Sequence, residues 1–408
     1  MRSIIISCNP VVKGGLGQLP ASKSMSNRAL LLNALSGNQS TIGNLAAARD
    51  TVLMKNLLNS PAQVADVMDA GTTMRFLTAY YAIIGQHKIL TGTPRMKQRP
   101  IGLLVDALRS LGATIDYTEE TGFPPLQIGT FEGQQANTVT VAGNVSSQYI
   151  SALMMVAPLL PQGLCIELEG KVGSRPYIDM TAALMNLFGA DCQVGNAKVQ
   201  IAPGKYRPTE ITIEPDWSAL SYWFAMVALA SEAELVLNGV NSFSLQGDRV
   251  VIDIMEKLGV KVQFKNDSAV LSKTHFVAQA IEWDFTHCPD LAQTVLPVCA
   301  LKGVSGTFTG LESLYIKETD RIKALRQELA KGGARLYEGT PGVFKLEPGE
   351  APSGQIQIAT YHDHRMAMGF APWATQMEVE ILEPEVVNKS YPGFWDHLQQ
   401  VGFKTTPV

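Results

Sequence analysis

The sequence predicts an α/β protein built from two domains, each made of three mixed βα modules. Its 408 residues exceed the size at which one hydrophobic core usually stops growing, so two domains are expected. A recurring step supports the modules: an amphipathic helical segment gives way to a glycine and then to alternating, strand-like residues. These glycines lie roughly 70 residues apart, too far for solenoid repeats, so each repeat must be a compact module. They are Gly112, Gly189, Gly259, Gly333 and Gly402.

Glycine suits this step because the residue after a helix commonly adopts a left-handed conformation. The segment VLMKNLLNS, near residue 52, is a sixth and more degenerate copy. Helix–glycine–strand steps also occur in unrelated α/β proteins, but the regular spacing favours true repeats. Six modules predict two domains of three, and GQLPAS (17–22) and EPDWS (214–218) are the candidate hinges.

The composition argues against several classes of protein. Lys and Arg number 33 against 37 Asp and Glu, whereas a nucleic-acid binder is normally basic. An acidic protein can still bind anions where its cations converge. Five scattered cysteines without a C-x-x-C pair predict reduced thiols in the cytoplasm rather than disulfides or structural zinc. The apolar run at the N-terminus is too short for a signal-peptide core, and no later stretch is long enough for a membrane span, so no membrane association is expected.

Basic residues stand at the starts of three predicted helices in the first half of the chain. LPASKSMSNRALLL (19–32) surrounds Lys23 with small hydroxyl residues, but it lacks the glycine that a P-loop requires before the lysine. Free N–H groups and the helix dipole favour an anion at such a start. DAGTTMRFLTA (69–79) and TGTPRMKQRP (91–100) place further cations near helix starts, the second before a helix opened by Pro100. The first motif is equally compatible with a capped surface helix, and a short basic cluster is usually a solvated face. Two such clusters, each at a helix start, together favour an anion-lined cleft.

Two serine-containing motifs follow in the same half of the chain. NVSSQYISALMMVAPLL (144–160) offers small polar residues before an apolar helix, and a helix cap is the favoured interpretation there. SRPYIDM (174–180) is ambiguous in the same way.

The second half of the chain concentrates charge in four short blocks. HCPDLAQTVLPVCA (287–300) places Asp290 at the opening of an apolar helix, and LYIKETDRIKALRQEL (314–329) packs four charges into five residues. ATYHDHRMAMGF (359–370) precedes another apolar helix, and VVNKSYPGFWDHL (386–398) isolates Lys389 at a strand-to-helix turn. His362, Asp363 and His364 could suggest a metal site, but Arg365 would repel the ion, and no companion ligand pattern is present.

In their order along the chain, these blocks resemble the signature motifs of the EPSP synthase family, the 3-phosphoshikimate 1-carboxyvinyltransferases. The resemblance runs from residue 19 to residue 398, which is nearly the whole chain. It is carried by LPASKSMSNRALL, DAGTTMR, PRMKQRPI, NVSSQ, SRPYID, IKETDRI, YHDHRMAM and NKSYPGF.

The resemblance implies two similar domains, each of three βαβαββ units with the helices packed inside the sheets, and an active site in the cleft between the domains. Residues 1–20 would join 215–408 to form the domain with the KETDR, HDHR and NKS motifs. Residues 21–214 would form the other, with the SKSMSNR, DAGTTMR, PRMKQRP and SSQ motifs. The implied protein is a cytoplasmic monomer without metal or organic cofactor.

The implied reaction transfers the enolpyruvyl group of phosphoenolpyruvate to the 5-hydroxyl of shikimate 3-phosphate, a step of the shikimate pathway to chorismate and aromatic amino acids. The family's roles carry over motif by motif. The catalytic groups would be Lys23, Asp290, Glu318 and Lys389. Shikimate 3-phosphate would contact Lys23, Ser24, Arg28, Ser146, Ser147, Gln148, Ser174, Tyr177, Asp290 and Lys317. Phosphoenolpyruvate would contact Lys23, Gly71, Thr72, Arg99, Gln148, Arg321, His364, Arg365 and Lys389.

A few positions depart from the residues most common in the family, and none of these changes removes a charge-carrying group. They bear on affinity and on the potency of glyphosate, the family's inhibitor, rather than on activity. The positions are Asp69, Thr73, Phe76, Ser313 and His362.

The chemistry explains why cations and carboxylates are needed together. The two substrates carry two phosphates and two carboxylates, and Lys and Arg offset the cost of burying them. We expect the 5-hydroxyl to attack C2 of phosphoenolpyruvate while C3 is protonated, and the tetrahedral intermediate to lose phosphate and a C3 proton. Glu318 is the expected carrier of the C3 proton, and Asp290 the expected base for the hydroxyl. Lys23 and Lys389 would neutralise the leaving phosphate.

Three other functions compete with this interpretation. The related transferase that acts on UDP-N-acetylglucosamine has a Cys-bearing loop without a counterpart here. A catalytically dead anion-binding protein on the same scaffold would not need the catalytic lysines and carboxylates. An RNA 3′-phosphate cyclase of similar modules would be expected to have a basic surface.

Overall fold

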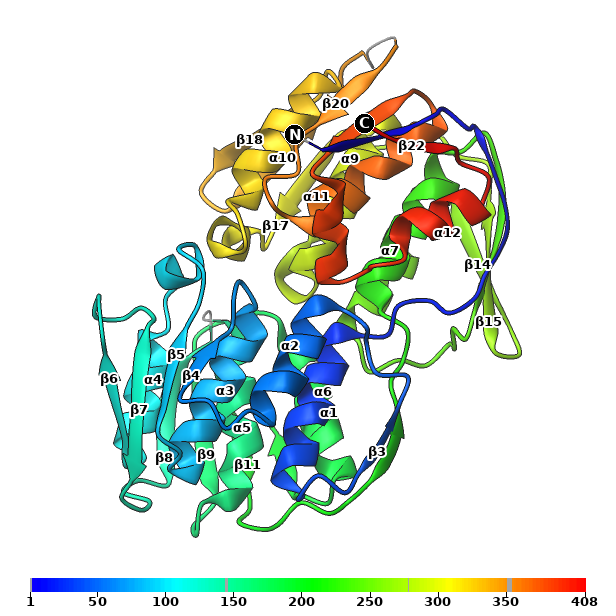
Figure 1. Cartoon of the computed structure of the whole chain (residues 1–408). Coiled ribbons are helices and arrows are strands. Elements are labelled where there is room, and N and C mark those ends of the chain that lie inside the picture. Colours follow the sequence, from blue (N-terminus) through cyan, green and yellow to red (C-terminus); the bar gives the residue numbers. More distant parts are fainter. Residues whose placement is uncertain (1, 144–145, 278, 351–353) are drawn as a thin grey trace. The chain divides into compact units, whose positions relative to one another are not determined.

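The structure, a computed structural model, describes residues 2–143, 146–277, 279–350 and 354–408 (Figure 1). The chain forms two compact units: Met1–Ala21 with Glu214–Val408 is the first, and Ser22–Ile213 is the second. The sequence had suggested crossings between domains after residues 20 and 214. Asn144 and Val145, which open the NVSSQ motif, lie outside the described residues.

Two modules of the second unit follow the order β-α-β-α-β-β. In each, the first two strands pair in parallel and the last two complete the sheet in antiparallel fashion. One module comprises β4 (Val64–Asp66), α3 (Gly71–Ile84), β5 (Lys88–Thr91), α4 (Gly102–Ser110), β6 (Ala113–Tyr117) and β7 (Leu126–Phe131). The other comprises β8 (Thr138–Ala142), α5 (Ser147–Val156), β9 (Leu164–Glu169), α6 (Arg175–Leu187), β10 (Cys192–Val194) and β11 (Lys198–Ile201).

The first unit contains three modules of the same kind. One comprises β16 (Ile281–Asp284), α9 (Ala292–Leu301), β17 (Gly306–Thr309), α10 (Arg321–Lys331), β18 (Arg335–Thr340) and β19 (Val343–Glu347). A second comprises β2 (Val11–Leu16), α7 (Trp217–Leu229), β13 (Glu232–Asn238), α8 (Val251–Glu256), β14 (Val260–Lys265) and β15 (Ser268–Lys273). The third comprises β20 (Ile356–Ile358), α11 (His364–Phe370), β21 (Val379–Leu382), α12 (Phe394–Gln400) and β22 (Thr405–Pro407), with β1 (Ser3–Ile6) between β21 and β22.

The sixth module is reduced, as its degenerate sequence copy suggested. It has the helices α1 (Lys23–Leu35) and α2 (Arg49–Leu58) and a sheet of only two parallel strands, β3 (Thr41–Gly43) and β12 (Glu210–Thr212). Helix α2 ends at Asn59 with a negative φ, so the left-handed glycine of the other copies has no equivalent here.

The five glycines of the repeat all lie in the left-handed region, with φ between 80° and 108°. At Gly112 and Gly333 a side chain would also collide with backbone, because an added Cβ would lie 2.2 Å from the carbonyl oxygens of Gly133 and Glu350 respectively. These contacts explain why the turn from helix to strand requires glycine.

The central helices of each unit are buried. In the second unit α1 and α5 each pack against neighbouring helices and α3 lies beside both, and in the first unit α7, α9 and α11 pack together (Figure 1). Helix α7 is buried on every side because its sequence, WSALSYWFAMVAL, is apolar all round. Five of these helices begin at or next to a motif found in the sequence, and α7 begins within the candidate hinge EPDWS, so the fold places polar motif residues at helix starts. Pro100 precedes α4 by two residues instead of opening it, because α4 begins at Gly102.

The two-domain α/β class predicted from the sequence is confirmed, with five complete βαβαββ modules and one reduced module. No helix among the described residues combines the length and the apolar character needed to cross a membrane.

Candidate active site

The start of α1 carries a lysine paired with a buried carboxylate. The Ser22 hydroxyl caps the helix by accepting a hydrogen bond from the N–H of Met25 at 3.4 Å. Lys23 Nζ donates to Asp50 Oδ2 at 3.0 Å, and the exposed fractions of these two side chains are 17% and 6%. Lys23 is the first residue of α1, and a helix start favours a phosphate or carboxylate.

Arg28 lies one turn further along α1 and is almost fully buried. It donates to Thr181 Oγ1 at 2.7 Å, to Ser151 Oγ at 3.0 Å, and to the Ser24 carbonyl at 3.0 Å. Burial lowers the pKa of Arg28 to about 10. Most of its donors are thus used within the protein, and a contact with shikimate 3-phosphate stays a prediction.

A second cation, Arg99, lies against the start of α3. An ideal Cβ built on Gly71, the first residue of that helix, would fall 2.6 Å from both terminal nitrogens of Arg99. The side chain is 8% exposed, Nε is buried without a hydrogen-bond partner, and no carboxylate of the described residues pairs with it. A buried cation beside the positive end of a helix is unfavourable by itself, so this arrangement favours a bound anion.

Arg75 ties the start of α3 to the segment that carries Arg99. Its guanidinium donates to the Pro100 carbonyl at 2.8 Å and to the Gly71 carbonyl at 3.4 Å. Thr72 in the same turn accepts a hydrogen bond from Gln148 Nε2 at 3.1 Å. The starts of α3 and α5 are therefore linked by side chains that the sequence had singled out.

The remaining predicted residues of the second unit lie at the starts of α5 and α6. The Ser146 hydroxyl accepts from the N–H of Gln148 at 3.4 Å, so the predicted helix cap is confirmed. Ser174 is the N-cap residue of α6 in a left-handed conformation, with φ 52°. The Tyr177 ring lies 5.8 Å from the guanidinium of Arg28. The structure thus brings Tyr177 beside Arg28.

In the first unit a single arginine joins three carboxylates. Arg321 is 1% exposed and opens α10. It donates to Asp363 Oδ2 at 2.7 Å, to Asp290 Oδ1 at 2.9 Å and to Glu318 Oε2 at 2.9 Å. Burial by itself would lower the pKa of Arg321, but Asp363, Glu318 and Asp290 raise it above its usual value. Three of the charged blocks therefore meet at one guanidinium.

Asp290, just ahead of α9 in the short turn Pro289–Leu291, holds two further cations. Its Oδ2 accepts from Arg365 at 2.9 Å, and Lys317 Nζ lies 3.8 Å from Oδ1. Burial alone would raise the pKa of Asp290, yet Arg365, Lys317 and Arg321 together hold it well below its usual range. In this arrangement Asp290 is a weak base, so it must lose some of these partners to accept a proton from substrate.

Glu318 lies between two cations and is the other carboxylate available for proton transfer. Its Oε1 is 3.5 Å from Lys389 Nζ, while its Oε2 accepts from Arg321. Lys389 is buried at the end of the short helix Pro384–Lys389, and His364 is buried with Nδ1 3.7 Å from Asp363 Oδ1. All the predicted site residues of this unit therefore belong to one continuous cluster of charges.

Known proteins resemble this chain over nearly its whole length. The family described as EPSP synthase (3-phosphoshikimate 1-carboxyvinyltransferase) matches this chain over residues 10–60 and 54–398. A 3-phosphoshikimate 1-carboxyvinyltransferase of Bacteroides fragilis is 45% identical over 392 residues, covering 95% of each chain. The chain belongs to the EPSP synthase family.

A second relative and a solved structure agree with this membership of the EPSP synthase family. The 3-phosphoshikimate 1-carboxyvinyltransferase of Sodalis glossinidius is 37% identical over 434 residues, or 98% of each chain. The structure of an EPSP synthase from Acinetobacter baumannii superimposes with a TM-score of 0.76 over the whole of both chains, at 20% identity. At that identity the likeness bears on the fold.

The geometry adds residues to the EPSP synthase motifs that sequence reasoning had left without a role. Asp50 holds Lys23, and Asp363 holds Arg321 and caps α11 by accepting from the N–H of Arg365 at 2.9 Å. Asp363 could have been found from its position in the HDHR motif before an apolar helix, a typical cap position. Asp50 had no such signal, because its partner lies 27 residues away.

Asp248 is a third buried carboxylate that the sequence did not reveal. It lies in the turn Gly247–Val250 and is 5% exposed. Burial raises the pKa of Asp248 to about 7, and repulsion from Asp290 adds to the effect. A raised pKa means that the folded protein binds this proton more tightly than the unfolded chain, so stability falls as the pH rises through 7.

We therefore expect Asp248→Asn to raise the free energy of unfolding at pH 8, by on the order of a few kcal/mol, and to change it little at pH 4. Urea denaturation at both pH values measures the difference. Asp253→Asn, an exposed carboxylate in the first turn of α8, is the control and should show no such pH-dependent gain. An equal effect of Asp248→Asn at both pH values would contradict the raised pKa.

Gly71 gives a direct test of the predicted phosphoenolpyruvate contacts. A methyl group there must displace the Arg99 guanidinium, the end of a flexible side chain, so the fold should survive. We expect Gly71→Ala to raise KM for phosphoenolpyruvate and to weaken inhibition by glyphosate competitive with it, each by ~10-fold or more. Steady-state kinetics with glyphosate at several phosphoenolpyruvate concentrations measures both effects.

Gly102→Ala is a matched control for that variant. Gly102 is also the first residue of its helix, but an added Cβ would meet its nearest atom at 3.4 Å, an ordinary contact. Its kinetics should stay near wild type. If Gly71→Ala also left KM for phosphoenolpyruvate unchanged, Gly71 and Arg99 would not belong to that site.

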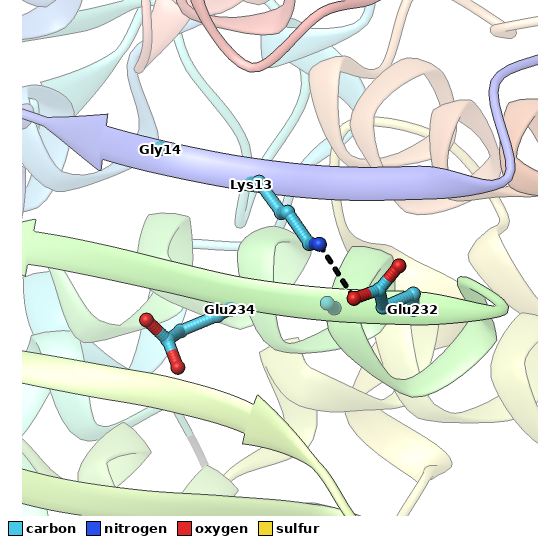
Figure 2. A pocket seen from close by; sticks show the side chains of 5 residues that line it. Lys13, Gly14, Glu232 and Glu234 are labelled. Atoms are coloured by element: carbon cyan, nitrogen blue, oxygen red, sulfur yellow. Dashed lines mark hydrogen bonds and ion pairs between the residues drawn. The ribbon is translucent and has the colours of Figure 1, made fainter.

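Two other kinds of feature, a metal cluster and a surface hollow, could indicate a binding site elsewhere in the described residues. Among the described residues no three His, Cys, Asp or Glu side chains gather in a way that could hold a metal ion. A surface hollow on β2 and β13 is lined by Lys13, Gly14, Glu232, Ala233 and Glu234 (Figure 2). Its ion pair, between Lys13 and Glu232 at 2.5 Å, is exposed, and such pairs contribute little binding energy.

Proposed function

We infer that this chain is a 3-phosphoshikimate 1-carboxyvinyltransferase, which transfers the enolpyruvyl group of phosphoenolpyruvate to the 5-hydroxyl of shikimate 3-phosphate and releases phosphate. Identity of 45% to a protein of that name, over 95% of both chains, carries this inference. This inference is supported by the charge cluster around Arg321 and by Arg99, a buried cation at a helix start, because both substrates are anions.

A phosphate-release assay with purified protein tests the activity. Phosphate should appear only when shikimate 3-phosphate and phosphoenolpyruvate are both present. The same assay with UDP-N-acetylglucosamine as acceptor should give no phosphate. Release with that acceptor alone would assign the chain to the related transferase, and no release with either would leave only an anion-binding protein.

We propose roles for the site residues that follow the family's motifs. Phosphoenolpyruvate would be bound in the second unit by Lys23, Gly71, Thr72, Arg99 and Gln148, and in the first by Arg321, His364, Arg365 and Lys389. Lys23, Ser24, Arg28, Ser146, Ser147, Gln148, Ser174, Tyr177, Asp290 and Lys317 would bind shikimate 3-phosphate. The short, charge-assisted contacts within each half-site support these roles, since such groups are held in place before substrate arrives.

The chemical steps follow from the carboxylates. Asp290 would orient the 5-hydroxyl and accept its proton once substrate has displaced some of its cations. Glu318 would donate a proton to C3 of phosphoenolpyruvate and take one back when phosphate leaves, as microscopic reversibility requires. Lys23 and Lys389 would neutralise the phosphate as it departs. No step calls for a metal or an organic cofactor.

The two half-sites would act on one pair of substrates, because the predicted contacts of each substrate come from both units. A ligand that touches both units favours the conformation that brings them together. We therefore expect saturating shikimate 3-phosphate to reduce the radius of gyration and to tighten phosphoenolpyruvate binding. Small-angle scattering with and without ligand measures the first effect, and an unchanged radius would contradict the closure.

We also propose that the protein works as a cytoplasmic monomer. The scattered, reduced cysteines predicted from the sequence support the compartment. Sedimentation equilibrium at assay concentration should give the mass of one chain, and a mass of two chains would contradict the monomer.

A further inference from the structure

Two adjacent residues ahead of α11 have a backbone conformation that side chains disfavour. Tyr361 has φ 54° and His362 has φ 57°, both in the left-handed region. Non-glycine residues rarely adopt this conformation, and for a bulky aromatic residue it is an outlier. Such strain persists only where the surroundings hold it in place, and it is common at functional sites.

The strained pair leads directly into the charge cluster. Asp363, the next residue, accepts from Arg321 at 2.7 Å and from the N–H of Arg365 at 2.9 Å. Arg365 in turn donates to Asp290 at 2.9 Å. The conformation at residues 361 and 362 therefore sets where the charged groups of Asp363, Arg321 and Arg365 lie.

A buried glutamate on α10 holds this segment through two hydrogen bonds. Glu328 is fully buried, its Oε1 accepts from the Tyr361 hydroxyl at 2.6 Å, and its Oε2 accepts from the N–H of Ala359 at 3.1 Å. Lys331 Nζ, 2.6 Å from Oε2, balances the charge. Burial and the hydrogen bond to Glu328 raise the pKa of Tyr361 well above its usual value, so the phenol remains a donor.

A second carboxylate, that of Glu383, contacts two other residues of the same segment. Glu383 Oε2 accepts from Thr360 Oγ1 at 3.3 Å and lies 3.2 Å from His362 Nδ1. His362 is 83% exposed, and Glu383 is 22% exposed. Because the Glu328 side chain is fully buried whereas Glu383 is 22% exposed, Glu328 is the stronger restraint.

We propose that Glu328, acting through Tyr361, is a positioning residue of the site: it keeps the segment 359–363 in its strained conformation and so sets Asp363, His364 and Arg365 for phosphoenolpyruvate. Within the part of the chain that the structure describes, Glu328 forms its hydrogen bonds and ion pair with Lys331, Ala359 and Tyr361, none of which is predicted to contact substrate. This inference rests on the proposed function, because it concerns the same reaction. It adds Glu328 and Tyr361 to the site residues that were assigned from the family's motifs.

Tyr361→Phe tests the inference with the smallest possible change, since it removes only the hydroxyl. A displacement of ~1 Å in a tight site can cost ~10²-fold in catalysis. We expect KM for phosphoenolpyruvate to rise at least ~10-fold, and KM for shikimate 3-phosphate to stay within ~3-fold, because His364 and Arg365 are predicted phosphoenolpyruvate contacts. A merely structural role would move both constants together.

The matched control is Tyr337→Phe. Tyr337 also donates to a glutamate at 2.6 Å, Glu347 Oε1, but this pair is exposed on β18 and β19. Its kinetics should equal those of the wild type. Glu328→Gln, which removes the charge and one of the two acceptor oxygens, should reproduce the selective rise in KM for phosphoenolpyruvate.

Amide hydrogen exchange of residues 359–370 gives a readout that does not need turnover. Exchange in this segment should be faster in Tyr361→Phe than in the wild type or in Tyr337→Phe. Unchanged exchange together with unchanged KM, or equal changes in both KM values, would overturn the inference. Absence of turnover in the wild type would instead overturn the proposed function, and exchange would still decide whether Glu328 holds the segment.

Discussion

Glu318→Gln is expected to lower kcat by ~10²–10⁴-fold while KM for both substrates changes only a few-fold. Glutamine keeps the shape of the side chain and can still accept a hydrogen bond from Arg321, which lies 2.9 Å from Oε2. It cannot carry the proton that C3 of phosphoenolpyruvate must gain and then lose. The loss should therefore fall on the chemical step and leave binding largely intact.

Glu312→Gln is the control for this variant. Glu312 opens the short helix Glu312–Ile316 just before the KETDR motif and is exposed, so the same substitution should leave kcat unchanged. Steady-state kinetics for both variants, with single-turnover measurements to isolate the chemical step, provides the test. Near-normal kcat in Glu318→Gln would remove Glu318 from the mechanism.

Local features of the site could be predicted from the sequence because they depend on neighbouring residues. A serine before an apolar helical run predicts a cap, and the caps at Ser22 and Ser146 are confirmed. The repeated glycines predict left-handed helix ends, and all five have positive φ. The six modules followed from the same periodicity, including the reduced one.

Partners distant in the sequence could not be predicted in this way. Arg321 meets Asp290 and Asp363, which are 31 and 42 residues away, and nothing in the local pattern states that these carboxylates share one guanidinium. Buried charges without a motif, such as Asp50 and Asp248, were missed for the same reason. The family resemblance supplied the identities of many site residues, while the structure supplied the pairing among them.

The two half-sites differ in how their cations are balanced. In the first unit Arg321 and Arg365 already pair with carboxylates, so an anionic substrate, if bound there as proposed, would compete with Asp290, Glu318 and Asp363. In the second unit Arg99 has no carboxylate partner among the described residues. Lys23 of the second unit pairs with Asp50, whereas Arg321 joins three carboxylates, so a change at Arg321 should be strongly disruptive.

Arg321→Lys is expected to abolish most of the activity and to destabilise the fold together. Lysine keeps the positive charge, but its single ammonium cannot reproduce three separate contacts with Asp363, Asp290 and Glu318. Removing one partner of a buried ion pair typically costs about 3–5 kcal/mol, because it leaves an uncompensated charge. We expect kcat/KM to fall by at least ~10²-fold, since both predicted proton-transfer carboxylates lose their restraint.

Arg326→Lys, on the same helix, is the matched control. Arg326 is only partly buried, and its guanidinium stacks over Phe344 at 6.0 Å, so the same substitution should change stability by less than about 1 kcal/mol. Urea denaturation and kinetics of the two variants, measured side by side, separate the loss of the forked contacts from the loss of an arginine in general.

The pH dependence identifies the cause of the instability in Arg321→Lys. In the wild type Arg321 helps hold the pKa of Asp290 below its usual value, and this stabilisation is present above the pKa of the unfolded chain and lost as the pH falls through the folded pKa. In the variant, burial raises the pKa of a carboxylate that has lost its cation, so the orphaned carboxylates take up protons by pH 4, and the variant should lose more stability at pH 8 than at pH 4. Equal loss at both pH values would show that Arg321 stabilises the unit by packing, and that its charge does not govern the three carboxylates.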